Sequence, residues 1–91
     1  MARIRTVKPE FWTSGQVMDL SIPARLLFIG MWNFCDDAGI HPASEKRLKA
    51  EVFPADDISL ADVRGMIAEL NSVGLLTEYE IDGESYWQVT G

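Results

Sequence analysis

The chain has 91 residues, of which 47% are hydrophobic and 24% charged, and its formal net charge is −6. This length suits one domain with a single modest core, and the composition excludes a disordered chain. No apolar run reaches the roughly 18 residues that a membrane span needs, and the first residues lack the apolar segment of a signal peptide. A single cysteine, Cys35, and a single histidine, His41, are too few for a disulfide or a four-ligand zinc site, so we expect a cytoplasmic protein without a metal.

The charges are divided unevenly along the chain. Residues 1–49 contain seven Lys or Arg against five acidic residues, or +2, and residues 50–91 contain one Arg against nine acidic residues, or −8. Any surface for nucleic acid is therefore expected in the first half.

The first twenty residues predict a basic arm followed by a short helical turn. Pro9 suits the first turn of a helix, and Gly15 is expected to end it. Phe11 and Trp12 should pack against the rest of the protein, because neighbouring aromatic side chains are unfavourable in water.

A strongly apolar helix is predicted from about Ser21 to Phe34. Ser21 is a suitable N-cap, and Pro23 fits in the first turn, where a missing N–H costs nothing. Apolar side chains occur on nearly every side of this helix, so we expect it to be buried almost all round. Gly39 then stops the segment, and a very short strand is predicted near Ile40.

Two further helices follow. The second runs roughly from Ser44, its N-cap, to Phe53. Ser59 begins the third, in a capping-box arrangement with Asp62, and Gly74 ends it. The apolar residues of the third helix recur at helical spacing and are expected to face inward: Leu60, Val63, Met66, Ile67, Leu70 and Val73. His41, between the first two helices, is expected to be an ordinary loop residue.

Residues 75–90 predict a β-hairpin around Asp82-Gly83. A two-residue loop pairs Tyr79 with Tyr86, whereas a three-residue loop pairs Tyr79 with Trp87. We favour the three-residue loop, because one face of the hairpin must be buried and this loop places five apolar side chains on the same face: Leu75, Tyr79, Ile81, Trp87 and Val89.

This order of elements is that of a winged helix, an α+β fold of the helix-turn-helix class. Residues 1–91 would form one such domain. It comprises the arm and helical turn over 1–20, a three-helix core over 21–74 and a wing hairpin over 75–90.

Three stretches are long and specific enough to suggest a family: "IRTVKPEFWTS", "DLSIPARLLFIGMWNFCDDAG" and "PASEKRLKAEVFPADD". They closely resemble the N-terminal region of phage and prophage replication proteins of the DnaD-like, replisome-organiser type. The resemblance covers essentially all 91 residues. It implies a winged helix that serves DNA replication in a bacterial host cell, through DNA contact, self-association or both. Such proteins usually continue into a further domain, so we expect this chain to be either an excised N-terminal domain or a natural short form.

The residue types permit only a restricted contact with DNA. In a winged helix the third helix enters the major groove and the wing touches phosphates, but here the wing has no Lys or Arg. The candidate phosphate contacts are the cations of the arm and of the second and third helices: Arg3, Arg5, Lys8, Lys46, Arg47, Lys49 and Arg64. They support weak, salt-dependent binding through about three to six phosphates. The alternative is that residues 46–49 form a solvated face of the second helix together with Glu45 and Glu51, in which Glu45 and Lys49 have the favourable four-residue spacing.

The predicted wing carries four carboxylates: Glu78, Glu80, Asp82 and Glu84. One interpretation is that they provide solubility and protect a strand edge. The other is a docking surface for a basic partner, including the basic arm of a second copy.

No motif indicates an enzyme. The paired acids Asp36-Asp37 and Asp56-Asp57 fall in predicted turns, and the chain has no glycine-rich phosphate loop and no spaced nucleophile and base. We therefore expect a non-enzymatic module with no cofactor and no small-molecule substrate. Its leading function is DNA association and/or self-assembly in phage DNA replication. The alternatives are a protein-interaction module that has lost DNA binding, such as a phage-encoded modulator of a host complex, and a transcriptional regulator.

Overall fold

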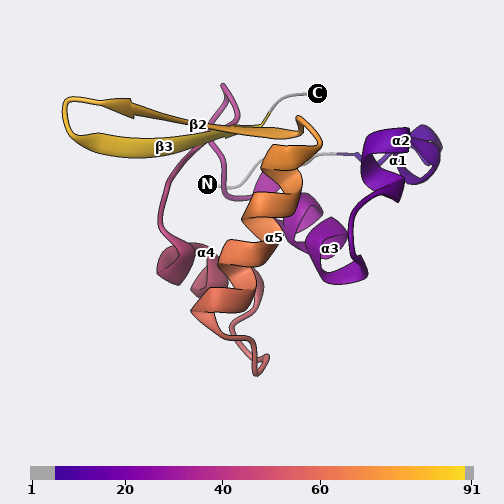
Figure 1. Cartoon of the computed structure of the whole chain (residues 1–91), viewed down its shortest axis with the longest axis horizontal. Coiled ribbons are helices and arrows are strands. Elements are labelled where there is room, and N and C mark those ends of the chain that lie inside the picture. The colour runs from indigo at the N-terminus through magenta and orange to yellow at the C-terminus, as the bar shows by residue number, and fades with distance from the viewer. Residues whose placement is uncertain (1–5, 90–91) are drawn as a thin grey trace.

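The structure is a computed structural model of the chain and describes residues 6–89. This part of the chain has five helices and a three-stranded antiparallel sheet, which confirms an α+β protein (Figure 1). The elements are, in chain order, α1 (Pro9–Thr13), α2 (Gly15–Met18), α3 (Ile22–Trp32), β1 (Ile40–Pro42), α4 (Glu45–Val52), α5 (Leu60–Ser72), β2 (Leu76–Ile81) and β3 (Glu84–Val89). The strand order is β1-β3-β2, and the β2–β3 hairpin extends past the helices on one side (Figure 1).

Two short helices replace the predicted helical turn before residue 20. Gly15 was expected to end that turn, but it begins α2. Phe11 packs as predicted, with its ring stacked on Phe28 and at the edge of Trp32. The same prediction for Trp12 is wrong, because its side chain is 53% exposed. Neighbouring residues of a helix point in different directions, and in α1 the direction of Phe11 is the one that meets α3.

The central helix α3 is buried on one side rather than all round. Its Ser21 cap is confirmed, since Ser21 Oγ accepts a hydrogen bond from the N–H of Ala24. The buried side consists of Ala24, Leu27, Phe28 and Met31. Ile22 and Leu26, in contrast, are 76% and 57% exposed, so the predicted burial is wrong there. Helices α4 and α5 pack against α3, and a domain of this size has too few residues to cover its remaining side.

The predicted second and third helices are confirmed as α4 and α5. Ser44 caps α4, and Ser59 and Asp62 form the predicted capping box at the start of α5. Most of the predicted inward stripe of α5 is buried (Val63, Met66, Ile67 and Leu70). Leu60, at the first position of α5, is 41% exposed, against the prediction. It lies at the open end of the helix, beside the turn that joins α4 to α5.

The hairpin uses the two-residue loop, so the favoured three-residue register is wrong. Tyr79 lies opposite Tyr86, and Glu78 lies opposite Trp87. Asp82 and Gly83 have φ angles of 51° and 82°, as a type I′ turn requires. That turn matches the twist of the two strands, and this match outweighs the single apolar face on which the prediction depended.

The very short strand predicted near Ile40 is confirmed as β1. It pairs with β3, with Ile40 opposite Gln88 and Pro42 opposite Tyr86. The sheet therefore links the segment after α3 to the hairpin and lies over one end of α5 (Figure 1).

Candidate nucleic-acid and partner interface

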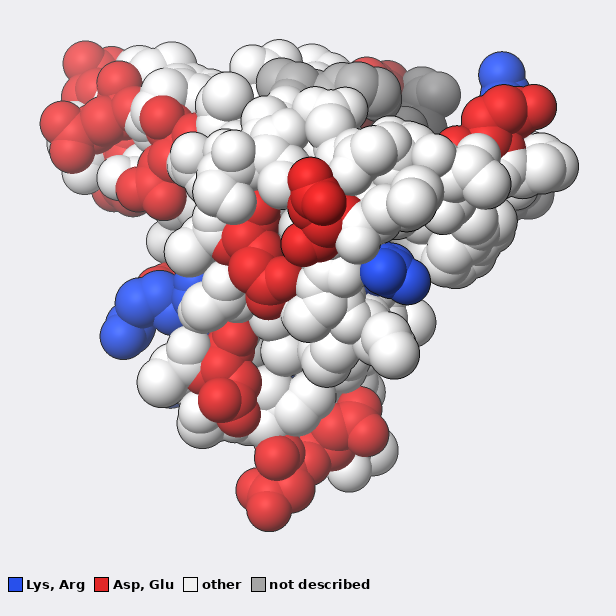
Figure 2. Space-filling view, turned by 45° about the vertical axis from the view of Figure 1, so that its right-hand side comes forward, with Lys and Arg blue, Asp and Glu red and all other residues white. Residues whose placement is uncertain are grey.

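The predicted phosphate-binding cations do not form one patch. Lys8 precedes α1, three of the others lie on α4, and Arg64 lies on α5. Arg3 and Arg5 lie outside the described residues. Figure 2 shows the Lys and Arg side chains of one face separated from each other, whereas acidic side chains gather on the hairpin and down the middle of that face. A continuous basic surface is therefore absent from the face shown, within residues 6–89.

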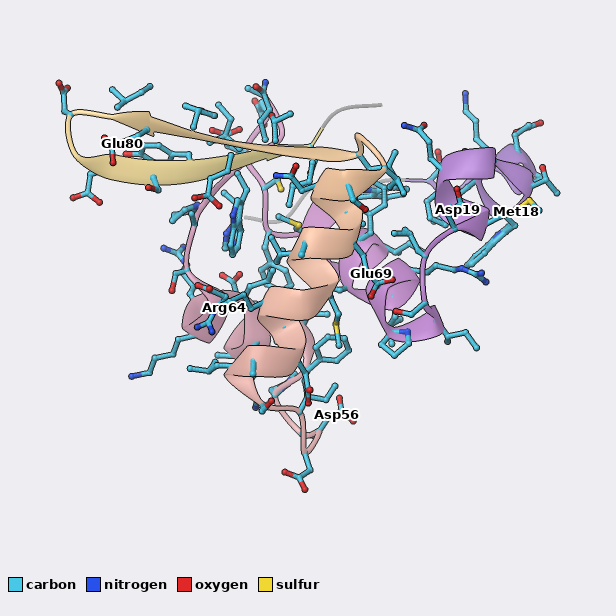
Figure 3. All side chains as sticks on the ribbon, viewed as in Figure 1. Met18, Asp19, Asp56, Arg64, Glu69 and Glu80 are labelled. Atoms are coloured by element: carbon cyan, nitrogen blue, oxygen red, sulfur yellow. The ribbon has the colours of Figure 1, made fainter. Side chains whose placement is uncertain are left out.

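Arg64, the single cation of α5, is held by a carboxylate of α4. Its Nε donates a hydrogen bond of 3.1 Å to Glu45 Oε1. A backbone hydrogen bond at Glu45 and the hydrogen bond from Arg64 lower the pKa of this carboxyl group. The predicted pair of Glu45 with Lys49 is wrong, because these two residues form no ion pair within residues 6–89. Figure 3 shows Arg64 on the side of α5 that is turned toward α4.

The three cations of α4 differ in whether they form an ion pair with a carboxylate. Arg47 Nε donates to Glu51 Oε2 at 3.2 Å, one helical turn along α4. Lys46 is exposed and Lys49 half-buried, and within residues 6–89 neither forms an ion pair. These two lysines are therefore the cations of α4 that are available to a phosphate.

The side of α5 that is turned toward the start of α3 is acidic. Asp62 is fixed in its capping box with Ser59, and Glu69 accepts 2.8 Å hydrogen bonds from both the backbone N–H and the Oγ of Ser21. Both carboxylates border a shallow hollow that contains Gly65. Figure 3 shows Glu69 on the side of α5 turned toward α3, away from Arg64. A DNA phosphate that approached this side would meet negative charge.

The four carboxylates of the hairpin are all exposed, and residues 75–89 contain no Lys or Arg (Figure 2). One of them, Glu78, also has a structural role, because Trp87 Nε1 donates a 2.9 Å hydrogen bond to its Oε1. Trp87 is buried, so this bond satisfies an indole N–H that would otherwise lose its contact with water.

His41 is a structural residue that the sequence prediction missed. Its side chain is fully buried and its ring stacks on Trp87, so the prediction of an ordinary loop residue is wrong. Nδ1 lies 2.7 Å from the carbonyl oxygen of Pro42, and Nε2 lies 2.6 Å from Glu51 Oε1. The signal available in the sequence was the strand predicted near Ile40, because alternate residues of a strand that covers a core point inward.

Two further observations concern other classes of site. Within residues 6–89, no three His, Cys, Asp or Glu side chains lie together in a way that suits a metal ion. The helices of that same part are each too short or too polar to cross a bilayer.

Comparisons with known proteins yield no relative. No family model, no curated protein and no solved structure matches the chain. The functional proposal therefore depends on the fold, on the charges described above and on the resemblance of the sequence.

Proposed function

We propose that this chain is a non-enzymatic winged-helix domain of the phage DNA-replication type, which acts in protein assembly and contacts DNA weakly through α4. The order α3, β1, α4, α5 and the β2–β3 hairpin supports a winged helix, with α4 and α5 as the helix-turn-helix and the hairpin as the wing. The replication setting is supported by the resemblance of the sequence.

One observation carries the assignment of roles within this domain. The two parts that usually meet DNA in a winged helix, α5 and the wing, present carboxylates, and Arg64 already pairs with Glu45. Nucleic-acid affinity depends on cations that are free to replace counterions at phosphates. Within residues 6–89 Lys46 and Lys49 form no ion pair, so DNA contact is assigned to α4 and protein contact to the acidic wing.

A DNA titration at two salt concentrations tests this proposal. We expect a labelled DNA duplex to bind weakly at about 50 mM salt, and its affinity to fall on the order of tenfold or more at about 200 mM. Lys46→Ala/Lys49→Ala should weaken binding at low salt and reduce the salt dependence. The matched variant Glu78→Gln/Glu80→Gln should bind at least as tightly as the wild type, because it removes repulsion from the wing.

A second candidate function is a protein-interaction domain with no DNA contact. The neutralised Arg64 and the pairing of Arg47 with Glu51 favour it. Absence of binding at low salt, or binding that Lys46→Ala/Lys49→Ala leaves unchanged, would decide for this candidate.

A further inference from the structure

The buried ring of His41 faces a hydrogen-bond acceptor at each of its two nitrogens. Nδ1 lies 2.7 Å from the carbonyl oxygen of Pro42, and Nε2 lies 2.6 Å from Glu51 Oε1. A neutral imidazole has one N–H donor and one bare nitrogen that is itself an acceptor. A neutral ring beside an ionised Glu51 would therefore set a bare nitrogen against an oxygen lone pair at hydrogen-bonding distance. Both contacts are hydrogen bonds only if this pair of side chains holds one further proton.

Two neighbouring side chains favour that proton on His41 rather than on Glu51. Arg47 Nε donates a 3.2 Å hydrogen bond to Glu51 Oε2, and a hydrogen bond from a guanidinium stabilises the ionised carboxylate. The ring of His41 also stacks on Trp87, with centroids 6.0 Å apart and planes 13° from parallel. The face of an indole is the negative part of its quadrupole and attracts a cation. The two nitrogens and the stacked face of the ring are therefore all in surroundings that suit an imidazolium.

The charged and titratable side chains of the surrounding elements are mostly acidic. They are Glu51 and Arg47 of α4, Asp36 of the turn before β1, Glu78 of β2, which bonds the indole of Trp87, and Tyr86 of β3, which lies opposite Pro42. On the side of α5, Arg64 is paired with Glu45, so that pair adds no net charge. Three carboxylates against one guanidinium stabilise a cationic ring and offset part of the cost of its burial.

We propose that His41 is a buried imidazolium whose proton joins the sheet to α4, and that this joint is therefore sensitive to pH. His41 belongs to β1, which pairs with β3, and Glu51 belongs to α4. Loss of the proton from Nε2 would replace a charge-assisted hydrogen bond by repulsion between a bare nitrogen and a carboxylate. The joint should weaken as the pH rises. This charge state does not depend on whether α4 contacts DNA.

The direction of the pH effect follows from the number of protons bound in each state. Above about pH 7 the histidine of an unfolded chain is neutral, whereas the folded protein keeps the proton of the joint. Unfolding then releases one proton, and the equilibrium constant of unfolding rises by up to about tenfold for each pH unit. At about pH 5 both states hold the proton, and the stabilisation by the joint is complete.

Urea unfolding of the full chain between about pH 6 and pH 9 tests the proposal with two variants of equal charge. The amide N–H of Glu51→Gln can donate to a neutral Nε2, so this joint no longer needs the further proton. We expect the wild type to lose stability relative to Glu51→Gln as the pH rises. Glu45→Gln is the matched control, because it removes the same charge from the same helix and keeps both contacts of His41. It should follow the wild type. The amino terminus and Cys35 titrate in all three proteins and cancel in the comparison.

Nitrogen NMR spectroscopy observes the proton directly and needs no variant, because the chain has a single histidine. An imidazolium has two protonated nitrogens with similar chemical shifts, whereas a neutral ring has one protonated and one bare nitrogen with well-separated shifts. We expect the first pattern for the folded wild type at about pH 8, where the histidine of an unfolded chain shows the second.

Two results would overturn the proposal. Separated shifts at that pH, together with parallel stability curves for the wild type and Glu51→Gln, would show that the folded pair holds no further proton. Separated shifts with the pH dependence of the wild type intact would place the proton on Glu51 and leave His41 neutral.

Discussion

His41 and Glu51 are joined by a 2.6 Å contact between Nε2 and Oε1 that connects β1 to α4. The ring of His41 is fully buried, and its other nitrogen lies 2.7 Å from the Pro42 carbonyl oxygen. A buried polar group that loses its hydrogen-bond partner cannot form a replacement bond to water. Removal of only one partner of such a contact therefore destabilises the protein. This pair therefore holds the sheet on the α4–α5 unit.

Removal of the Glu51 carboxylate should destabilise the domain by about 1–3 kcal/mol, because it leaves a ring nitrogen of His41 without its partner. Arg47→Ala is the matched control, since it breaks the exposed ion pair with Glu51 and keeps the contact with His41. We expect that control to cost about 0.2–1 kcal/mol. Urea unfolding of Glu51→Ala and Arg47→Ala measures both values, and equal midpoints would contradict a structural role for His41.

The pair between Glu45 and Arg64 makes a pH-dependent contribution to stability. The pKa of Glu45 is lowered from its ordinary value of 4.5, first by a backbone hydrogen bond and then by Arg64. A lowered pKa means that the contribution is complete above 4.5 and is lost as the pH falls through the folded-state value. The free energy of unfolding of the wild type should therefore exceed that of Glu45→Gln at pH 7. We expect a difference of only about 0.2–1 kcal/mol, because the pair is partly exposed. Urea unfolding of the two proteins should give the same free energy of unfolding in acid. A difference that grows as the pH falls would contradict a lowered pKa for Glu45.

The hairpin turn should be sensitive at Gly83 and tolerant at Asp82. Both residues have positive φ, at 82° and 51°. Gly83→Ala places a Cβ in a left-handed conformation and should cost about 1 kcal/mol. Asp82→Asn should be neutral or stabilising, because Asn-Gly is the preferred pair of a type I′ turn. Thermal unfolding compares the two, and a Gly83→Ala protein as stable as the wild type would argue against the two-residue loop.

The features that could be predicted are those whose interacting residues lie close together in the sequence. Ser21, Ser44 and Ser59 cap helices through bonds to residues three positions away, so the local pattern was sufficient to place the starts of α3, α4 and α5. The exposure of Leu26 could not be predicted from the local pattern. Apolar residues occur on all sides of α3, but this pattern does not determine how many other elements pack against the helix.

The hairpin register and His41 needed information from outside their own segments. The favoured register assumed one buried face that includes Ile81, but the hairpin projects past the helices, where Ile81 is 54% exposed. Glu51, the partner of His41, lies on a different element and shows no spacing motif with it. Lys46, Arg47 and Lys49 lie on α4 and Arg64 lies on α5, which are the helices predicted for them. The pair of Arg47 with Glu51 lies within α4 at a spacing of four residues, whereas the pair of Arg64 with Glu45 depends on how α4 packs against α5.

Two helical glycines should respond in opposite directions to the same substitution. A Cβ on Gly30 of α3 would lie 2.6 Å from Val52 Cγ1 of α4, whereas a Cβ on Gly65 of α5 would meet no atom within 4 Å. Gly30→Ala should therefore cost about 1–3 kcal/mol through overpacking, and Gly65→Ala should gain about 0.5–1 kcal/mol through helix propensity.

A third variant tests the reason for the loss. Gly30→Ala combined with Val52→Ala removes the clashing methyl groups and should recover part of the stability lost by Gly30→Ala alone, which is non-additive behaviour expected of residues in contact. Urea unfolding of the single and double variants gives the coupling energy. Strict additivity of the two single-variant effects would show that α3 and α4 are not in contact at Gly30 and Val52. It would then contradict the packing that positions the lysines of α4.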